Sequence, residues 1–364
     1  MKPPASPWRP EHPLSGVPPS LPTSLGLPPF RQRPPWWGPD LQTLRDTLWP
    51  VPLPPDRSRP LSIDIGGGDQ LLARLEGPLT AAARALVLIV PGLGGSADAP
   101  GPRRLALALQ RAGFASLRLN LRGAGPGRHL AAGSYAARCD RDLLPVLERA
   151  HQLAGPLPLV AAGFSLGGTI LLNACQAAAG EALAALVCVG SPVDLLGCSA
   201  ALSRPRNALY QAWLVSRLRR ETLADRRGLG EAERTILLGS SRPRSIRSFD
   251  ACITAPRWGY GSVDEYYAAA SPLALLRQQA LGHQGPRILL LHAADDPWVP
   301  VGPTQSLADL LAQIPPDPAP PALEVLVTRR GGHCGFHGEG DDPLASWSDR
   351  LAVAWLSSRL APEA

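Results

Sequence analysis

The stretch VAAGFSLGGTI, residues 160–170, contains the pattern G-x-S-x-G, with Ser165 between Gly163 and Gly167. An apolar run typical of a buried strand precedes the serine, and a helix-forming run begins directly after it. A serine on such a sharp turn projects its hydroxyl above the sheet, and the glycines let the backbone fold tightly around it. The pattern is short and also occurs by chance, so the rest of the chain must decide whether Ser165 is a nucleophile.

Apolar strands alternate with amphipathic helices on both sides of this turn, which is typical of βαβ units and of a mostly parallel sheet. The glycine-rich turn at 66–70 predicts a hairpin of the first two strands, which would supply an antiparallel edge. The pattern predicts an α/β fold with eight strands and with helices on both faces. The expected strands are 61–65, 71–76, 85–90, 115–123, 157–165, 185–193, 287–296 and 323–332, and a helix is expected over 135–155.

The N-terminal part of the chain has a different composition. The first sixty residues hold 18 of the 42 prolines, and proline lacks the amide donor that helices and central strands need. We predict a disordered or extended arm over residues 1–28. Residues 29–60 are expected to pack on the core, because Trp36 and Trp37 would be costly to leave in water.

The main domain is expected over residues 61–360, and its alternation stops between about 194 and 285. This segment is rich in helix formers, arginine and aromatic residues. It follows one predicted strand and precedes another, so we expect a helical cap inserted over the carboxyl ends of the strands, where open α/β sheets place their sites.

Composition narrows the class of protein. The formal net charge is +6, but the basic residues are scattered arginines with Lys2 as the single lysine, which argues against a nucleic-acid partner. The six cysteines form no C-x-x-C pair, so we expect reduced thiols and no zinc site. The chain shows no secretory signal and no apolar run long enough for a membrane span, which predicts a cytoplasmic protein; peripheral membrane contact stays open. Nothing in the sequence indicates an oligomeric state.

Candidate partners for Ser165 follow the last two predicted strands. His333 lies in the glycine-flanked stretch TRRGGHCGF, and Asp295 and Asp296 lie in HAADDPWVP. The order serine, acid, histidine is the order that α/β-hydrolases use. We predict a triad of Ser165, His333 and Asp296, with Asp295 as the reserve for the acid. Cys334, beside the histidine, is an alternative nucleophile but lacks the sharp-turn context.

The loop after strand 85–90, PGLGGS, leaves backbone amides open to a ligand. The amide of Leu166, directly after the serine, is a predicted oxyanion donor, and a second donor is expected among the amides of this loop, residues 92–95. The other interpretation of this loop is an ordinary glycine turn.

The chain resembles the YheT-like α/β-hydrolases and the related ABHD1- and ABHD3-type lipid and ester hydrolases. The matching segments run from about residue 30 to 360: WWGPDLQTL, PGLGGS, RAGFASLRLNLRGAG, NALYQAWLVSRL, RSFDACITAPRWGYGSVDEYYAAASPLALL, HAADDP and GGHCGF. One departure is Pro91-Gly92, where that family usually has His-Gly, which affects how the oxyanion loop is held. For Arg122 we favour a structural ion pair, and for Tyr266 and Tyr267 packing of the cap onto the core.

The resemblance implies a serine esterase that cleaves carboxylic esters, expected to be short- to medium-chain acyl esters or lipid-like molecules, through an acyl-enzyme. The resemblance also implies Leu93 as the second oxyanion donor, and it implies no metal or organic cofactor. Two alternatives stay open: an acyltransferase that uses the same triad to move an acyl group to an alcohol, and a non-catalytic lipid- or partner-binding module on the same fold.

Overall fold

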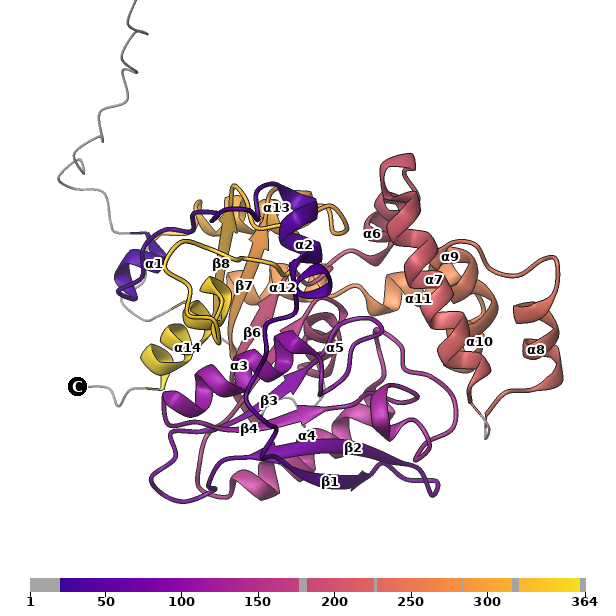
Figure 1. Cartoon of the computed structure of the whole chain (residues 1–364), viewed down its shortest axis with the longest axis horizontal. Helices are drawn as coiled ribbons and strands as arrows, with labels where there is room; N and C mark the ends of the chain where they lie inside the picture. Colours follow the sequence, from indigo (N-terminus) through magenta and orange to yellow (C-terminus); the bar gives the residue numbers. More distant parts are fainter. Residues whose placement is uncertain (1–19, 177–181, 226–227, 283–284, 316–320, 361–364) are drawn as a thin grey trace, which may run out of the picture.

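A computed structural model describes residues 20–176, 182–225, 228–282, 285–315 and 321–360. Its centre is an eight-stranded sheet in the order β1-β2-β4-β3-β5-β6-β7-β8 (Figure 1). β2 is antiparallel to both β1 and β4, and all other neighbouring pairs are parallel. This confirms the predicted fold class. The strands are β1 (Arg59–Asp64), β2 (Gln70–Glu76), β3 (Leu86–Val90), β4 (Ala115–Leu119), β5 (Leu159–Phe164), β6 (Leu183–Val189), β7 (Arg287–Ala293) and β8 (Leu323–Thr328).

The two faces of the sheet carry separate apolar layers. Alternate residues of β3 show the division, with Leu88 in the layer that α4 and α5 cover and Ile89 in the layer that α3 and α14 cover. Because both faces are covered, all five residues of β3 are buried, as expected for a central parallel strand. The helices of the body are α3 (Pro100–Arg111), α4 (Asp140–Ala154), α5 (Leu166–Ala174), α13 (Gly302–Leu311) and α14 (Trp347–Arg359).

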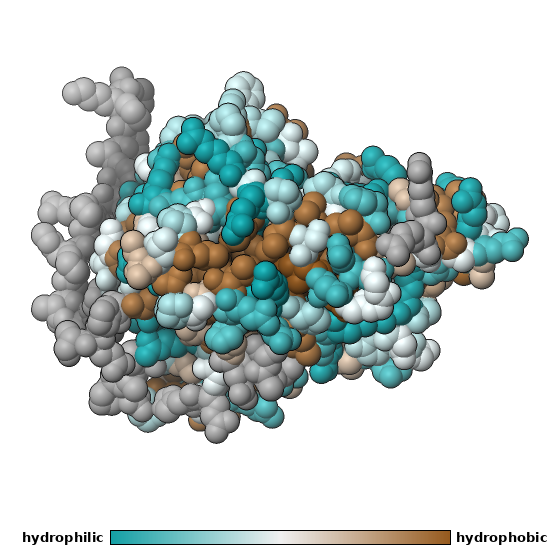
Figure 2. Space-filling model, turned by 90° about the horizontal axis from the view of Figure 1, so that it is seen from below, coloured by the Kyte–Doolittle hydropathy of each residue, from teal (hydrophilic) through white to brown (hydrophobic). Residues whose placement is uncertain are grey.

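A group of helices lies between β6 and β7 and projects from one end of the body (Figure 1). Figure 2, a view from below, shows this end as the narrower part of the molecule, and apolar residues form a band across the middle of that face. We call this helical group the cap. Its helices are α6 (Leu195–Leu202), α7 (Ala208–Leu223), α8 (Glu231–Leu238), α9 (Ile246–Phe249), α10 (Ala255–Arg257), α11 (Val263–Ala270) and α12 (Leu273–Leu281). They fall within the insertion predicted at about 194–285.

The N-terminal segment differs in part from the prediction. Most of the arm predicted over residues 1–28 lies outside the described residues, but its end forms a one-turn helix, α1 (Leu21–Ser24), rather than extended chain. Pro22 is tolerated in this first turn, and the leucines around it pack against the α14 side of the core. Further on, Phe30 contacts the rings of Phe336 and Trp347. Trp37 was expected to pack but is 60% exposed.

The helix predicted from residue 135 begins only at Asp140. The preceding residues instead make hydrogen bonds to distant parts of the chain. The Tyr135 hydroxyl accepts a hydrogen bond from the Gly94 amide, and the Ala137 amide donates to the Tyr266 hydroxyl. These contacts join the body to its loops and to the cap. Within the described ranges, no helix combines the length and apolar character needed to cross a membrane.

Candidate active site

Ser165 lies on the sharp turn between β5 and α5. Its φ of 50° and ψ of −125° place it in a region that side chains rarely adopt. A Cβ at Gly163 would collide with the backbone of Gly168, and a Cβ at Gly167 would collide with the carbonyl oxygen of Val90. The two glycines of the motif therefore let β5, α5 and the loop after β3 approach one another closely while the serine side chain stays exposed to the pocket.

The structure brings Ser165, His333 and Asp296 into one chain of hydrogen bonds. The Ser165 Oγ lies 2.8 Å from His333 Nε2, and His333 Nδ1 lies 2.8 Å from Asp296 Oδ2. The other oxygen of Asp296 accepts the amides of Trp298 at 2.8 Å and Val299 at 3.0 Å. With Nδ1 protonated, His333 donates to the carboxylate and presents Nε2 as the acceptor for the serine hydroxyl.

Asp295 and Cys334 occupy other positions. The Asp295 side chain accepts the Gly332 amide at 2.9 Å and makes no contact with the His333 ring. The Cys334 Sγ lies 3.2 Å from the backbone oxygen of Val189. The geometry therefore favours Asp296 over Asp295 as the acid, and it favours Ser165 over Cys334 as the nucleophile.

The charges of the buried pair support each other. Burial alone would raise the pKa of Asp296, but the charge and the hydrogen bond of His333 outweigh burial and hold this pKa below 3.8. Burial lowers the pKa of His333, but the Asp296 carboxylate and Cys334 together outweigh burial and raise it well above 6.5. His292, 3.7 Å from Asp296, has its pKa lowered by burial, so it contributes little positive charge. The low pKa of Asp296 therefore depends chiefly on His333.

Two aromatic rings support His333 from outside the triad. The ring of Trp298 stacks on His333 with centroids 4.5 Å apart, and Tyr210 of α7 meets Trp298 edge-on at 5.3 Å. The Tyr210 hydroxyl donates to Asp40 at 2.8 Å. The cap residue Tyr210 is thus linked to His333 through the ring of Trp298.

The helix α2 (Pro39–Leu48) makes hydrogen bonds to the backbone of His333 and His337. Its Thr43 Oγ1 accepts the His333 amide at 2.9 Å. Its Gln42 side chain donates to the His337 carbonyl at 2.9 Å and accepts the His337 amide at 2.7 Å. The WWGPDLQTL segment itself predicts no role for Gln42 or Thr43, because their partners lie far away along the chain.

The predicted oxyanion donors lie beside Ser165. Leu93 and Leu166 both line the pocket, and in the described part of the chain neither amide has a protein acceptor. Gly92 lies so close that a Cβ there would be 3.0 Å from the Ser165 Cβ. Despite Pro91, the loop closes through a bond from the Gly95 amide to the Gly92 carbonyl at 2.9 Å. The Gly94 amide also donates a hydrogen bond of 2.6 Å to the Tyr135 hydroxyl, which anchors this loop further. No local sequence pattern predicted this contact.

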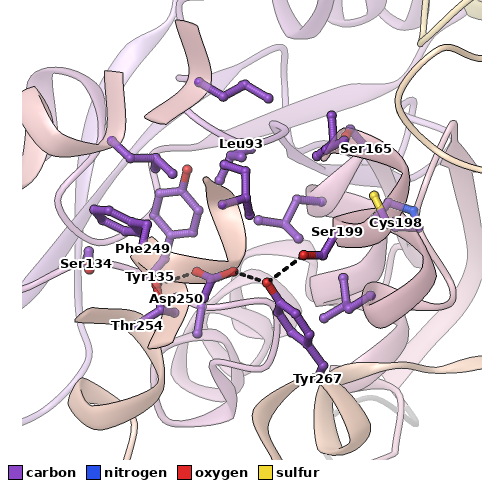
Figure 3. Close-up of a pocket in the computed structure, with 18 of the residues that line it drawn as sticks. Leu93, Ser134, Tyr135, Ser165, Cys198, Ser199, Phe249, Asp250, Thr254 and Tyr267 are labelled. Atoms are coloured by element: carbon purple, nitrogen blue, oxygen red, sulfur yellow. Dashed lines mark hydrogen bonds between the residues drawn. The ribbon is translucent and has the colours of Figure 1, made fainter. Parts of the chain in front are cut away.

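A pocket opens from Ser165 and His333 toward the cap (Figure 3). Its cavity volume is about 100 Å³. Its wall is mostly apolar, with leucines from both body and cap. The apolar and aromatic lining residues include Leu93, Leu166, Leu195, Leu202, Leu214, Leu218, Ile246, Phe249, Tyr266, Tyr267, Trp298 and Val299.

Arg122 does not line this pocket. It makes a bidentate pair with Asp142 at 2.7 and 2.8 Å and also contacts Asp69, so it is the structural arginine that we favoured. Tyr266 packs between cap and body, as expected. Tyr267 does more than pack, because its hydroxyl lines the pocket and donates to Asp250 at 2.8 Å. Among the described residues, no cluster of His, Cys, Asp and Glu is arranged to hold a metal ion.

Comparison with known proteins agrees with this architecture. The model of the alpha/beta hydrolase fold matches residues 85–339. The chain therefore belongs to the α/β-hydrolase family. A structure of a soluble variant of monoglyceride lipase from Saccharomyces cerevisiae has a TM-score of 0.52 and 18% identity, covering 85% of this chain and 98% of that one, which supports the fold.

Two curated relatives confirm the resemblance expected from the motifs. The chain is 28% identical over 305 residues to "Putative esterase YheT" of Escherichia coli (strain K12), covering 82% of this chain and 84% of the relative. It is 28% identical over 257 residues to "Phospholipase ABHD3" of Mus musculus, covering 70% of this chain and 59% of that protein. The chain thus spans less than two thirds of the mouse relative's length.

Proposed function

We propose that this chain is a serine hydrolase that cleaves carboxylic esters through an acyl-enzyme. The observation that carries the proposal is the chain of hydrogen bonds from Ser165 through His333 to Asp296, which opens on a mostly apolar pocket. A strained nucleophile, an oriented base and a buried acid are the parts that nucleophilic ester hydrolysis needs.

In the proposed mechanism His333 Nε2 takes the proton of Ser165 as its Oγ attacks the ester carbonyl. The negative charge that develops on the carbonyl oxygen is stabilised by the amides of Leu93 and Leu166, the second of which also lies at the N-terminus of α5. His333 then gives its proton to the departing alkoxide. Water, activated by the same histidine, attacks the acyl-enzyme and releases the acid.

The pocket favours an ester with an apolar part of short to medium length. Leucines of the cap and of the oxyanion loop surround the space next to Ser165, and burial of apolar groups there would supply binding energy of roughly 25 cal/mol per Å². The printed names of the two relatives, an esterase and a phospholipase, support an ester or lipid-like substrate class.

The direct test is labelling of the folded protein with a fluorophosphonate, followed by digestion and mass spectrometry. We expect one adduct, on Ser165, and none in the Ser165→Ala variant. Hydrolysis of p-nitrophenyl esters of graded chain length should depend on the same residue. Absence of both labelling and hydrolysis in the wild-type protein would overturn the proposal and favour a non-catalytic binding module.

The same acyl-enzyme could pass its acyl group to an alcohol instead of water. Adding an alcohol during turnover and measuring the ratio of new ester to free acid separates the two reactions. We expect free acid to dominate; a product that is mainly the new ester would replace hydrolysis by acyl transfer, with the same residues in the same roles.

A further inference from the structure

A carboxyl group lies in the wall of the pocket on the cap side. Asp250 begins a π-helical turn, Asp250–Thr254, between α9 and α10. Such turns interrupt α-helices often at functional sites. The Thr254 Oγ1 donates to one oxygen of Asp250 at 2.7 Å, and the Tyr267 hydroxyl donates to the other at 2.8 Å. The Ser199 Oγ lies 3.4 Å from the Tyr267 hydroxyl and extends this polar cluster (Figure 3).

Asp250 differs from the other enclosed carboxylates of this arginine-rich chain. Asp142 is paired with Arg122, and Asp349 is paired with Arg104. Within the described ranges, no ion pair includes Asp250. The arginine that approaches the cluster, Arg247 over the Tyr267 ring, binds Asp264 instead.

The two oxygens of a carboxylate offer about four acceptor positions, and two of those of Asp250 are filled by protein donors. Burial raises the pKa of this carboxyl to about 6, in spite of the hydrogen bonds from Thr254 and Tyr267. At neutral pH the group is therefore mainly ionised and has no positive partner. An enclosed charge of this kind is costly unless a donor or a cation reaches it.

The position of Asp250 suggests where that donor would come from. Asp250 lines the same pocket as Ser165, and Figure 3 shows the two residues well separated in the view. Much of the remaining wall is apolar. A molecule whose ester carbonyl lies at Ser165 can therefore place its apolar chain along the pocket and its far end at the carboxylate.

We propose that Asp250 is a specificity-determining residue that selects esters whose chain carries a hydrogen-bond donor, such as a hydroxyl or a protonated amine, at the end remote from the scissile bond. This inference rests on the proposed esterase function. Thr254 and Tyr267 orient the carboxylate, and the donor of the substrate occupies one of its free acceptor positions. An unsubstituted alkyl chain would leave that position unpaired.

The test compares three matched series of ethyl esters, of alkanoic, ω-hydroxyalkanoic and ω-aminoalkanoic acids, over a range of chain lengths. We expect the wild-type protein to prefer the hydroxy and amino esters at the chain length that reaches Asp250. In the D250N variant the ratio of kcat/KM for the amino ester to kcat/KM for the alkyl ester should fall by about tenfold or more, because a bond to a charged acceptor is lost. Hydrolysis of the alkyl ester should persist and show that the variant is folded.

The matched control is E221Q. Glu221 is a second carboxylate of the pocket wall, but it is paired with Arg217 at 3.0 Å, so its neutral variant should keep the wild-type preference. Equal kcat/KM for the three series in the wild-type protein would overturn the inference without any variant, and so would an unchanged preference in D250N. Both results leave the esterase proposal intact. Failure to hydrolyse any ester and to label Ser165 would instead overturn both.

Discussion

Asp296 in the body and Asp250 in the cap are enclosed carboxyl groups with opposite properties. Each accepts hydrogen bonds from neighbouring donors, and burial acts to raise the pKa of both. Asp296 ends with a pKa below 3.8, whereas the pKa of Asp250 reaches about 6. The difference is a neighbour that can carry positive charge: His333 contacts Asp296 at 2.8 Å, whereas Asp250 has no ion-pair partner among the described residues.

The two carboxylates show how one candidate site can combine two kinds of charge. The body supplies a charge whose partner is built into the protein, as a reaction that repeats unchanged requires. The cap supplies a charge that its own residues leave incompletely compensated, as selection of one substrate over another requires. Substitutions of the two groups should therefore have different effects. Changes at Ser165, His333 or Asp296 in the body should affect turnover of every ester, and changes at Asp250 in the cap should affect the choice among esters.

The largest effect is expected for Ser165→Ala, which removes the proposed nucleophile. Turnover of p-nitrophenyl esters should fall by at least about 10⁴-fold, while thermal unfolding should stay close to that of the wild-type protein because the side chain contributes little packing. Steady-state rates and a melting curve measure the two quantities. Residual activity within tenfold of the wild-type rate would remove Ser165 from the mechanism.

Substitution of the acid provides a matched pair of neighbours. D296N should lower kcat by about 10³–10⁴-fold because the wrong tautomer of His333 is then held. D295N keeps an acceptor oxygen for the Gly332 amide but removes the negative charge, and its rate should stay within about tenfold of wild type, as expected when one hydrogen bond is weakened. The reverse ranking would show that Asp295 is the acid and that the hydrogen bond of His333 to Asp296 has another role.

The sequence predicted the parts of this site that follow from local patterns. Apolar runs located every strand, and the glycines around Ser165 located the turn, because close backbone approach leaves a mark at the residue itself. Gln42 and Thr43 escaped assignment because the partner of Thr43 lies 290 residues away. Asp250 escaped it because an aspartate in a helical segment is ordinary until the pocket beside it is known. The helix predicted from residue 135 failed for the same reason, since distant contacts fix that stretch.

The pH dependence of the reaction should be determined by His333 and Asp296 in the body. His333 acts as a base only when it is neutral, and Asp296 raises its pKa above 6.5. Thus kcat/KM should rise with pH through an apparent pKa higher than 6.5, and below that pKa it should fall about tenfold for each pH unit. In D296N the residual activity should show this limb at lower pH, because the carboxylate no longer stabilises the charged ring. An unchanged limb in D296N would mean that another group titrates.

The pH dependence of the free energy of unfolding should include a contribution from Asp250 in the cap. The unfolded chain releases the Asp250 proton near 3.8, but the folded protein keeps it until about pH 6. Between these values the folded state binds more protons, so this residue lowers the free energy of unfolding as pH rises. D250N cannot titrate, and its stability relative to wild type should increase by roughly 1–2 kcal/mol from pH 4 to pH 7, less than the full shift implies because the side chain keeps partial exposure.

Urea unfolding of both proteins at several pH values measures this difference. Tyr267, Tyr266 and Tyr135, the tyrosines that interact with Asp250, have pKa values raised above 10 and do not titrate in this range. A difference that is constant with pH would mean that the carboxyl has an ordinary pKa, and the contrast with Asp296 would then disappear.

The smallest effect on turnover is expected at Thr43, whose hydroxyl accepts the His333 amide from outside both body and cap. T43V keeps the shape of the side chain but leaves that amide unpaired, so kcat should fall by about two- to tenfold. KM should change little, because Thr43 does not line the pocket. T43S restores the acceptor and should restore the rate. Loss of activity in T43S as well as T43V, with equal loss of stability, would assign Thr43 to folding alone. Recovery in T43S would show that α2 positions His333, the proposed base.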